Sequence, residues 1–586
     1  DSRAILGTLR GRIGDVSFET PVTVPAASAI TVKLDPSSQA ALRLKNPKLW
    51  WPNGYGEPNL YATELKFEVA GKVSDAKTFQ TGVRQFTFSE QGGALRMWIN
   101  GRRFVPRGGN WGFGESMLRY RAREYEAAMR YHRDMNFTMV RNWVGQIGDE
   151  EMYDAADRNG IVIWHDFWLA NPWDGPDPDN DAMFMANARD MIRMVRTHAS
   201  VGLYCGRNEG FPPKALEDGL QESVAELHPG MHYIPSSADD VVSGHGPYQA
   251  MPVKFYYTQR ATKKMHSELG MPNIMTLDSV KATMPESAMW PQGDMWGLHD
   301  FSLTGAQGAS SFRDRIEKSY GGAASAAEWT TLAQFVNYEG HRAMFESQSK
   351  YRMGLLIWMS HPTWPSFVWQ TYDYFFEPTA AYFGCKKASE PLHIQWNQAT
   401  DQVEVVNYSA GDRTGLTASI QILNLDGAVK WERSATVDSP EDSVSSPIKI
   451  EFPEGLTPTH FVRLRLMKDA AVLSENLYWR GTEEGNYRAI RDLPKVKLET
   501  STKTGRKGGQ WILTTELRNT SATPALLVRL KPVREKSGDR ILPALFSDNY
   551  VTLMPGERRT VTIELADVDA RGEAPKVVVE GFNSTT

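Results

Sequence analysis

The sequence has few cysteines, no long apolar run and no cluster of basic residues. Only two of its 586 residues are cysteines, Cys205 and Cys385, so a framework of disulfide bonds is excluded. No apolar stretch reaches the roughly 18 to 20 residues that a membrane-spanning helix needs, and the polar opening residues show no signal peptide. Acidic and basic residues are mixed along the chain, and the net charge is -5. We therefore expect neither a nucleic-acid partner nor a membrane span.

Tryptophan is frequent in a composition that is otherwise ordinary for a globular protein. Hydrophobic residues make up 41% of the chain and charged residues 23%, and 18 residues are tryptophan. Indole rings fill the cores of large domains, and they also stack on the apolar faces of sugar rings in concave sites. Composition alone leaves both roles open. Many of the tryptophans lie in one region: Trp98, Trp111, Trp143, Trp164, Trp168, Trp173, Trp290, Trp296, Trp358, Trp364 and Trp369.

The spacing of apolar residues divides the chain into four domains, since its length exceeds what one core supports. Residues 1–87 show short alternating strands, typical of an immunoglobulin-like β-sandwich, whose missing first strand we expect to lie upstream of this chain. In residues 88–390, short apolar runs alternate with amphipathic stretches of helical period, which predicts a (β/α)8 TIM barrel. Two further immunoglobulin-like sandwiches are predicted at 391–482 and 483–586. The predicted fold is multidomain, with a central barrel flanked by sandwiches.

Barrel enzymes carry their active sites at the C-terminal ends of the strands. We place the eight strands at 102–110, 137–143, 161–167, 201–209, 231–237, near 252–257, 265–270 and 354–360. Amides, carboxylates and indoles stand at the ends of these strands: Asn110, Trp111, Asn142, Trp143, His165, Asp166, Asn208, Glu209, Glu268 and Trp358. His165 and Asp166 alone are too few ligands for a metal site. We therefore expect no metal and no cofactor.

Glu209 and Glu268 form the candidate catalytic pair. Glu209 ends the fourth predicted strand in YCGRNEGFPP, and Glu268 ends the seventh in MHSELG. Glycosidic cleavage needs one protonated carboxyl group that donates to the leaving oxygen and one ionised group that attacks the anomeric carbon. Asn208, directly before Glu209, adds an amide that can bind a sugar hydroxyl near the reacting centre. The pattern favours a glycosidase.

Fragments along nearly the whole chain resemble glycoside hydrolase family 2. The resemblance is to the branch that holds β-mannosidases, endo-β-mannosidases acting on mannosyl glycans, and exo-β-glucosaminidases. It implies a retaining double displacement on an oligosaccharide or glycan, no cofactor, and a secreted or periplasmic location. The fragments are NPKLWWPNGYGEPNLY, RRFVPRGGNW, VRNWVG, GRNEGFPP, GPYQ, SELGMP, VKATMP, FFEPTAAYFGCKKASEPLHIQ and SDNYVTLMPGE.

The resemblance also assigns roles to residues. Glu209 is similar to the general acid/base of the family and Glu268 to the nucleophile, and Asn208 corresponds to the amide that holds the sugar 2-hydroxyl or its neighbour. Exo-β-glucosaminidases of this branch carry Asp where Glu209 stands, which favours mannosides. The other substrate-binding candidates are Asn110, Trp111, Asn142, Trp143, Asp166, Tyr248, Trp296 and Trp358.

One departure concerns the jelly-roll domain with which the family usually opens and which contributes a loop to the pocket. We find no such domain in this sequence and expect it to have been removed or to be supplied by another chain. Without that loop, the substrate site of this chain is expected to be unfinished.

Three other interpretations stay open. An exo-β-glucosaminidase would need an acidic group near the sugar 2-position, for which Asp166 is a candidate. A glucuronidase would need a cation, such as Arg207 or Arg141, although Arg141 fits a bracing role in the barrel interior better; a galactosidase is a further activity within the family. A carbohydrate-binding scaffold would keep the aromatic pocket without turnover, but the presence of both Glu209 and Glu268 argues against it.

Overall fold

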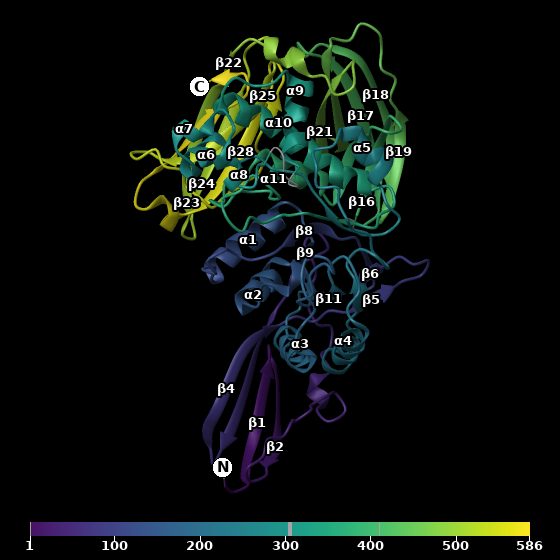
Figure 1. Cartoon of the computed structure of the whole chain (residues 1–586), viewed down its shortest axis with the longest axis vertical. Helices are drawn as coiled ribbons and strands as arrows, with labels where there is room; N and C mark the ends of the chain where they lie inside the picture. The colour runs from purple at the N-terminus through teal and green to yellow at the C-terminus, as the bar shows by residue number, and fades with distance from the viewer. Residues whose placement is uncertain (1, 303–307, 409–410, 586) are drawn as a thin grey trace.

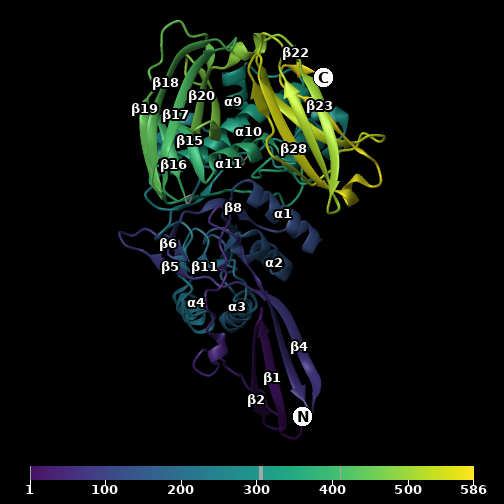
Figure 2. The same ribbon diagram turned by 180° about the vertical axis from the view of Figure 1, so that it is seen from behind.

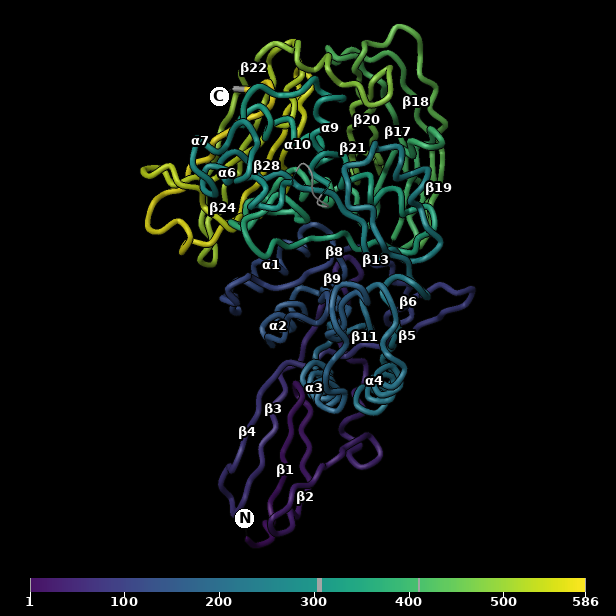
Figure 3. Tube along the Cα trace, in the orientation of Figure 1, coloured from purple at the N-terminus to yellow at the C-terminus, as the bar shows by residue number. Residues whose placement is uncertain are grey.

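The computed structural model describes residues 2–302, 308–408 and 411–585. An N-terminal sheet forms one end of the molecule, parallel strands lie in the middle, and two β-rich domains lie side by side at the other end (Figure 1, Figure 2). The Cα trace in Figure 3 shows the two termini at opposite ends. None of the described helices is long and apolar enough to cross a membrane.

The N-terminal region is a single antiparallel sheet with the strand order β2-β1-β3-β4. No second sheet faces it within residues 2–85, all of which the structure describes, and residues 28–35, whose apolar residues alternate as in a strand, form none. A short three-stranded sheet, β5-β6-β7, follows at the barrel. The elements are β1 (Ile5–Ile13), β2 (Val16–Val24), η1 (Ala40–Leu42), β3 (Tyr61–Val69), β4 (Lys72–Thr81), β5 (Phe86–Ser89), β6 (Arg96–Ile99) and β7 (Arg102–Phe104).

The central sheet is all parallel and has the order β12-β11-β10-β9-β8-β14-β13. The first barrel strand, β8, pairs with both the second and the last, so the sheet curves back on itself. Gly108 in β8 permits a close approach, because a Cβ there would lie 1.7 Å from the carbonyl oxygen of Met139. The strands are β8 (Arg107–Trp111), β9 (Met139–Asn142), β10 (Val162–Asp166), β11 (Val201–Arg207), β12 (Tyr233–Ser236), β13 (His266–Leu269) and β14 (Leu355–Ile357).

The sixth position of the barrel is not where the sequence placed it. Residues 253–260 are helical, and the buried Val253, Tyr256 and Tyr257 follow the helical period rather than the alternation of a strand. The position beside β13 is instead taken by Ser243, which forms a parallel bridge to His266. This segment is short and rich in Gly and polar residues, so it gives no strand signal. The predicted class, a barrel flanked by sandwich domains, is confirmed.

Helices cover the outside of the barrel. α1 to α4 follow the first strands, and the long α10 packs against the C-terminal domains (Figure 1). They are α1 (Ala122–Asp134), η2 (Trp143–Gly145), α2 (Glu150–Asn159), α3 (Asp181–Val195), α4 (Lys214–Leu227), α5 (Val253–Phe255), η3 (Tyr256–Arg260), α6 (Leu277–Thr283), α7 (Glu286–Met289), α8 (Asp294–Leu298), α9 (Ala309–Tyr320), α10 (Ala326–Gln348) and α11 (Ala380–Ala388).

Each of the two C-terminal domains contains two antiparallel sheets. In the first, β15-β16-β19 lies with β18-β17-β20-β21, and in the second, β23-β24-β28-β26 lies with β27-β25-β29, beside the small β22-β30 pair. Arg342 of α10 joins the first to the barrel by donating to Asn476 Oδ1 at 2.9 Å. The elements are β15 (Leu392–Asn397), β16 (Gln402–Asn407), β17 (Arg413–Asn424), β18 (Val429–Ser439), β19 (Ser443–Lys449), β20 (Thr459–Lys468), β21 (Ala471–Gly481), η4 (Arg488–Asp492), β22 (Val496–Lys497), β23 (Glu499–Lys507), β24 (Gln510–Arg518), β25 (Ala525–Arg534), β26 (Ala544–Phe546), β27 (Val551–Leu553), β28 (Arg558–Ala566), η5 (Asp567–Ala570), β29 (Pro575–Glu580) and β30 (Ser584–Thr585).

Candidate active site

Glu209 and Glu268 meet at the C-terminal ends of the barrel strands through one shared partner. The hydroxyl oxygen of Tyr248 lies 3.1 Å from Oε1 of Glu209 and 2.7 Å from Oε2 of Glu268. The two facing carboxylate oxygens are therefore separated by less than roughly 6.5 Å, which is the lower limit of the carboxyl separation in inverting glycosidases. A tyrosine hydroxyl donates only one proton, so both contacts are satisfied together when one carboxyl group is protonated and donates back. The geometry therefore fits a pair that holds one proton.

Glu268 is buried, with 2% of its surface exposed, and pairs with a guanidinium. Arg141 Nη1 donates to Glu268 Oε1 at 2.6 Å. Burial raises the pKa of Glu268, the positive charge of Arg141 lowers it, and the negative charge of Glu209 raises it again; the net direction is upward. The ion pair with Arg141 opposes protonation of this carboxyl group, so within the pair it favours the ionised form at Glu268.

Arg141 organises the floor of the site from β9. It is fully buried and donates to Asp166 Oδ2 at 2.6 Å and to the side-chain oxygens of Asn110 and Asn208 at 3.1 and 2.7 Å. Burial lowers the pKa of Arg141, but the charges of Asp166 and Glu268 raise it by more, so the net direction is upward. This guanidinium fixes Glu268 relative to the strand that ends in Asn208 and Glu209.

Asp166 is a support for Arg141 and not a group that faces a ligand. Both of its oxygens accept from Arg141, the Trp164 indole donates to Oδ1 at 2.7 Å, and the backbone N–H of Val144 donates to Oδ2 at 3.0 Å. Its carboxylate is therefore saturated and fully buried. The suggestion that Asp166 binds a 2-amino group of a sugar is not supported by this geometry.

Glu209 is held by groups from two loops that the sequence did not single out. Asn171 Nδ2 donates to Glu209 Oε2 at 2.7 Å, and His245 Nδ1 lies 3.2 Å from Oε1. His245 Nε2 is in turn 2.7 Å from Asp239 Oδ1. The backbone of Glu209 has a φ of 43°, in the left-handed region that non-glycine residues rarely adopt. The strained turn after β11 thus aims this carboxylate at its partners.

His245 places a titratable group next to Glu209. Burial lowers the pKa of His245, but the hydrogen bond to Asp239 and the charges of Glu209, Asp239 and Glu268 raise it by more. The ring lies between Glu209 and Asp239, so negative charge on either side chain stabilises its protonated form. Asp239 and His245 lie in the loop after β12 and Glu209 follows β11, so sequence spacing alone does not show that they are in contact.

Aromatic rings surround the carboxylate pair. The ring centroid of Trp358 lies 5.0 Å from Trp143, 6.2 Å from Tyr248 and 6.0 Å from Trp369. The indole N–H groups of Trp143 and Trp369 are buried and have no hydrogen-bond partner among the described residues. Unsatisfied donors beside apolar rings are suited to a hydroxylated ligand. Trp369 was not predicted as a site residue.

Three predicted binding residues belong to the core instead. Trp111 stacks on His361 with 4.2 Å between ring centroids, and Trp296 stacks on Phe367 at 4.4 Å. Asn142 donates to the carbonyl of Ile147 at 2.8 Å. All three are fully buried, and Asn110 is likewise buried, donating to the backbone carbonyl of Ser267 at 2.8 Å. A position at a strand end does not determine which way the side chain points.

Comparisons with known proteins bear on the family to which the chain is related. The description "Glycosyl hydrolases family 2" matches residues 4–84, and "Exo-beta-D-glucosaminidase Ig-fold domain" matches residues 476–584. An exo-β-D-glucosaminidase of Streptomyces avermitilis is 29% identical over 99% of this chain and 70% of its own length. The chain thus carries a domain of glycosyl hydrolases family 2 and is similar over nearly its whole length to an enzyme of that kind. The predicted resemblance is thereby confirmed.

Other relatives place the chain within the family. A mannosylglycoprotein endo-β-mannosidase of Lilium longiflorum is 27% identical over 96% of this chain and 71% of its own length. The solved exo-chitosanase CsxA of Amycolatopsis orientalis covers the whole chain at 25% identity with a TM-score of 0.89, and the chain covers 75% of it. A β-D-mannosidase structure from Dictyoglomus thermophilum shares the fold, with a TM-score of 0.80 at 21% identity, covering 100% and 73%. The chain is a β-glycosidase of this family.

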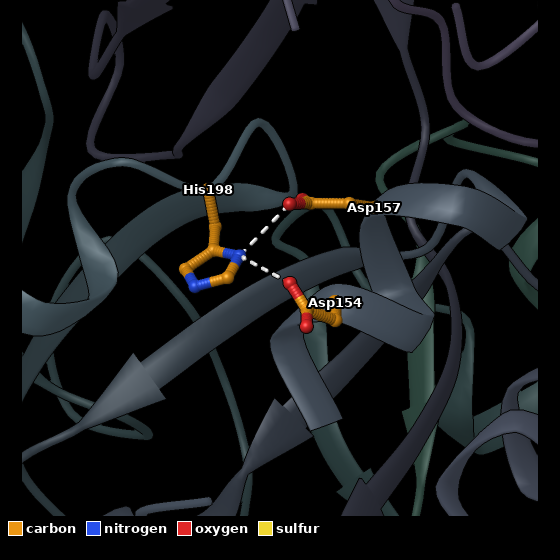
Figure 4. Close-up of side chains that lie close together, drawn as sticks. All are labelled: Asp154, Asp157 and His198. Atoms are coloured by element: carbon orange, nitrogen blue, oxygen red, sulfur yellow. Dashed lines mark hydrogen bonds and ion pairs between the residues drawn. The ribbon is translucent and has the colours of Figure 1, made fainter. Parts of the chain in front are cut away.

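A second group of titratable side chains lies at the opposite end of the barrel strands. His198 Nδ1 is 2.8 Å from Asp157 Oδ2 and 3.8 Å from Asp154 Oδ1, and Figure 4 shows both carboxylates turned toward this nitrogen. The shorter contact is a hydrogen bond, and Asp157 Oδ1 also accepts from the backbone N–H of Ser200 at 2.7 Å. The trio therefore joins α2 to the start of β11 as an ion pair, without needing a metal to explain its arrangement.

This trio predicts a pH-dependent contribution to stability. Burial lowers the pKa of His198, but Asp157 and Asp154 raise it by more, so it exceeds the unfolded value of about 6.5. A raised pKa stabilises the fold fully below that unfolded value, and the contribution is lost as pH rises through the folded pKa. We expect His198→Gln to cost about 1 to 3 kcal/mol in slightly acidic solution and less at high pH. Thermal unfolding midpoints of the wild type and the variant at both pH values measure this.

The matched control is His232→Gln, which removes a more exposed histidine contact with Glu90. Its effect is expected to be small at both pH values. A destabilisation by His198→Gln that does not depend on pH would contradict the ion-pair interpretation.

Proposed function

We propose that the chain hydrolyses β-linked mannosides by a retaining double displacement. The observation that carries this proposal is the hydroxyl of Tyr248, which touches both Glu209 and Glu268. The two contacts keep the facing carboxylate oxygens closer together than the roughly 6.5 Å at which the carboxyl separation of inverting glycosidases begins, which supports a retaining pair. An inverting enzyme would need room for a water molecule between the sugar and the second carboxylate.

The partners of the two carboxyl groups assign their roles. Glu268 is paired with Arg141, a permanent cation that favours the ionised nucleophile, whereas Glu209 accepts from the neutral amide of Asn171 and lies 3.2 Å from His245, a group that can itself exchange a proton. Glu209 donates its proton to the leaving oxygen while Glu268 forms a bond to the anomeric carbon. Formation of the glycosyl ester removes the negative charge of Glu268, and ionised Glu209 then takes a proton from the attacking water.

The charges around the pair favour a neutral sugar. An ammonium group at the 2-position would need a carboxylate without a counter-charge, but Asp166 is bound by Arg141 and Asp239 by His245. The raised pKa of His245 also favours a positive charge 3.2 Å from Glu209, which would repel an amino sugar. Mannosides and other neutral glycosides meet no such barrier. Asn208 supplies the amide expected near the 2-hydroxyl, held in place by Arg141.

A β-D-glucosaminide is the second candidate. It is favoured by the match of residues 476–584 to the Ig-fold domain of exo-β-D-glucosaminidases and by the 29% identity to one such enzyme. The C-terminal match lies outside the barrel, however, so it bears on the scaffold more than on the pocket.

A panel of aryl glycosides separates these candidates. We expect the highest kcat/KM on the β-mannoside, weaker hydrolysis of the β-glucoside, and none of the α-mannoside, which is the matched control. Proton NMR taken early in the reaction is expected to show the β-anomer of the released sugar. Preference for the β-glucosaminide would select the second candidate, and initial release of the α-anomer would contradict the retaining mechanism.

A further inference from the structure

Two exposed aromatic side chains stand on loops beside Glu209. Trp173, in the loop between β10 and α3, is 65% exposed, and Phe211, in the loop between β11 and α4, is 49% exposed. Exposed aromatic side chains that gather at one place on a surface commonly mark a binding site. Here each of two loops at the mouth of the barrel carries one. Their position relative to the catalytic pair indicates what they bind.

The two loops lie on the side of Glu209 that faces away from Glu268. Oε1 of Glu209 contacts Tyr248 and so faces the nucleophile, whereas Oε2 accepts from Asn171, two residues before Trp173. Phe211 follows Glu209 by two residues. In a displacement, the leaving oxygen departs from the face of the anomeric carbon opposite the nucleophile. The departing sugar is therefore expected on the Oε2 side.

A buried arginine ties these loops together. Arg207 is only 4% exposed; its Nε donates to the carbonyl of Ala170 at 2.8 Å and its Nη1 to Asp177 Oδ1 at 2.7 Å. The same Nη1 lies 3.5 Å from the carbonyl of Phe211. With its Nε and Nη1 engaged by the loops, Arg207 fits a brace between them better than a cation for a glucuronide carboxylate.

The backbones of the loops also approach closely. The N–H of Asn208 donates to the carbonyl of Leu169 at 3.0 Å, and a Cβ on Gly210 would lie 2.5 Å from Pro172 Cγ. Contacts of this kind hold the two aromatic side chains on a fixed support. A preorganised platform loses less conformational entropy when a ligand binds than a flexible loop does.

We propose that Trp173 and Phe211 form the binding platform for the leaving-group sugar of a β-linked oligosaccharide. The rings present apolar faces to the C–H groups of a pyranose, next to the carboxyl group that protonates its glycosidic oxygen. The inference rests on the proposed function and adds the two residues that bind the leaving-group sugar.

The variants Trp173→Ala and Phe211→Ala test the platform. Each is assayed on two substrates that carry the sugar preferred in the aryl glycoside panel but differ in their leaving groups. For a mannosidase these are β-1,4-mannobiose, whose leaving group reaches the platform, and β-mannosyl fluoride, whose leaving group is a single atom. We expect the ratio of kcat/KM on the disaccharide to kcat/KM on the fluoride to fall about 10-fold or more in each variant. Trp364→Ala removes another exposed indole, on the loop after β14, and is expected to leave this ratio unchanged.

The outcomes separate the two proposals. If the wild-type chain hydrolyses neither substrate, the proposed function fails and the platform fails with it. If the wild type hydrolyses both and neither variant changes the ratio, the glycosidase stands and the platform is wrong. Both aromatic residues are exposed, so unchanged thermal unfolding midpoints are expected to exclude misfolding as a cause of a lower ratio.

Discussion

Glu268→Gln is expected to lower kcat for β-glycoside hydrolysis by about 10⁴-fold or more. The amide has nearly the size and shape of the carboxylate, but it cannot attack the anomeric carbon as an anion. Arg141 Nη1, 2.6 Å from Oε1 in the wild type, retains an oxygen acceptor if the amide is oriented correctly. The chemical step is therefore lost while the surroundings of residue 268 are largely kept.

The experiment measures kcat and KM on the aryl glycoside that the wild type prefers, together with the thermal unfolding midpoint. A matched control is Glu339→Gln, which changes a buried glutamate of α10 that accepts from Tyr487 far from the site. This control is expected to affect stability but not kcat. Turnover by Glu268→Gln near the wild-type level would exclude residue 268 as the nucleophile and remove the basis for the double displacement.

The candidate catalytic pair could be proposed from sequence because parallel barrels impose a simple rule. Strand ends converge at one face, so an apolar run that stops on a carboxylate marks a position in the site. Glu209 and Glu268 both follow this rule, and the structure brings them to one hydroxyl although 58 residues separate them in the chain. The fold class could also be predicted from sequence, because few architectures other than a parallel sheet covered by helices accommodate short apolar strands that alternate with amphipathic helices.

The position of a strand end predicts neither the direction in which a side chain points nor the path of a loop. Trp111 and Asn142 also end strands, yet they point into packing layers behind the site, because neighbouring residues of a strand face opposite sides. Asn171 and His245 reach Glu209 from loops whose path is set by tertiary contacts. Arg141 combines both difficulties: its position on β9 was visible, but only the structure shows that it contacts Glu268, Asp166, Asn110 and Asn208 together.

The arrangement around Arg141 joins stability to catalysis. One buried guanidinium neutralises Asp166, holds Glu268 and fixes the amide before Glu209, so the proposed nucleophile and the residue next to the proposed acid are positioned by the same group. Removing one partner of a buried ion pair leaves an uncompensated charge, which is costly. The core of this barrel is therefore polar where the chemistry takes place and apolar elsewhere.

Glu209→Ala is expected to have an effect that depends on the leaving group, and this dependence identifies the acid/base. For a disaccharide, whose leaving oxygen must be protonated, we expect kcat/KM to fall by about 10² to 10⁴-fold. For a 2,4-dinitrophenyl glycoside the leaving group departs without a proton, so the glycosyl-enzyme forms readily. It then accumulates, because no base activates the water that would release it.

Azide supplies the decisive measurement for this variant. The space left by the deleted carboxylate admits the small anion, which needs no base and attacks the ester on Glu268 directly. Turnover of the dinitrophenyl glycoside by Glu209→Ala is expected to rise with azide concentration, and the product is expected to be the β-glycosyl azide, identified by proton NMR. The wild type, whose ionised Glu209 repels the anion, serves as the control and is expected not to respond.

Asn171→Ala, which removes only the amide that donates to Oε2, is expected to lower kcat without becoming responsive to azide. An α-glycosyl azide, or no acceleration at all, would overturn the assignment of Glu209, because a retained configuration arises only if azide enters from the face that the acid/base occupied.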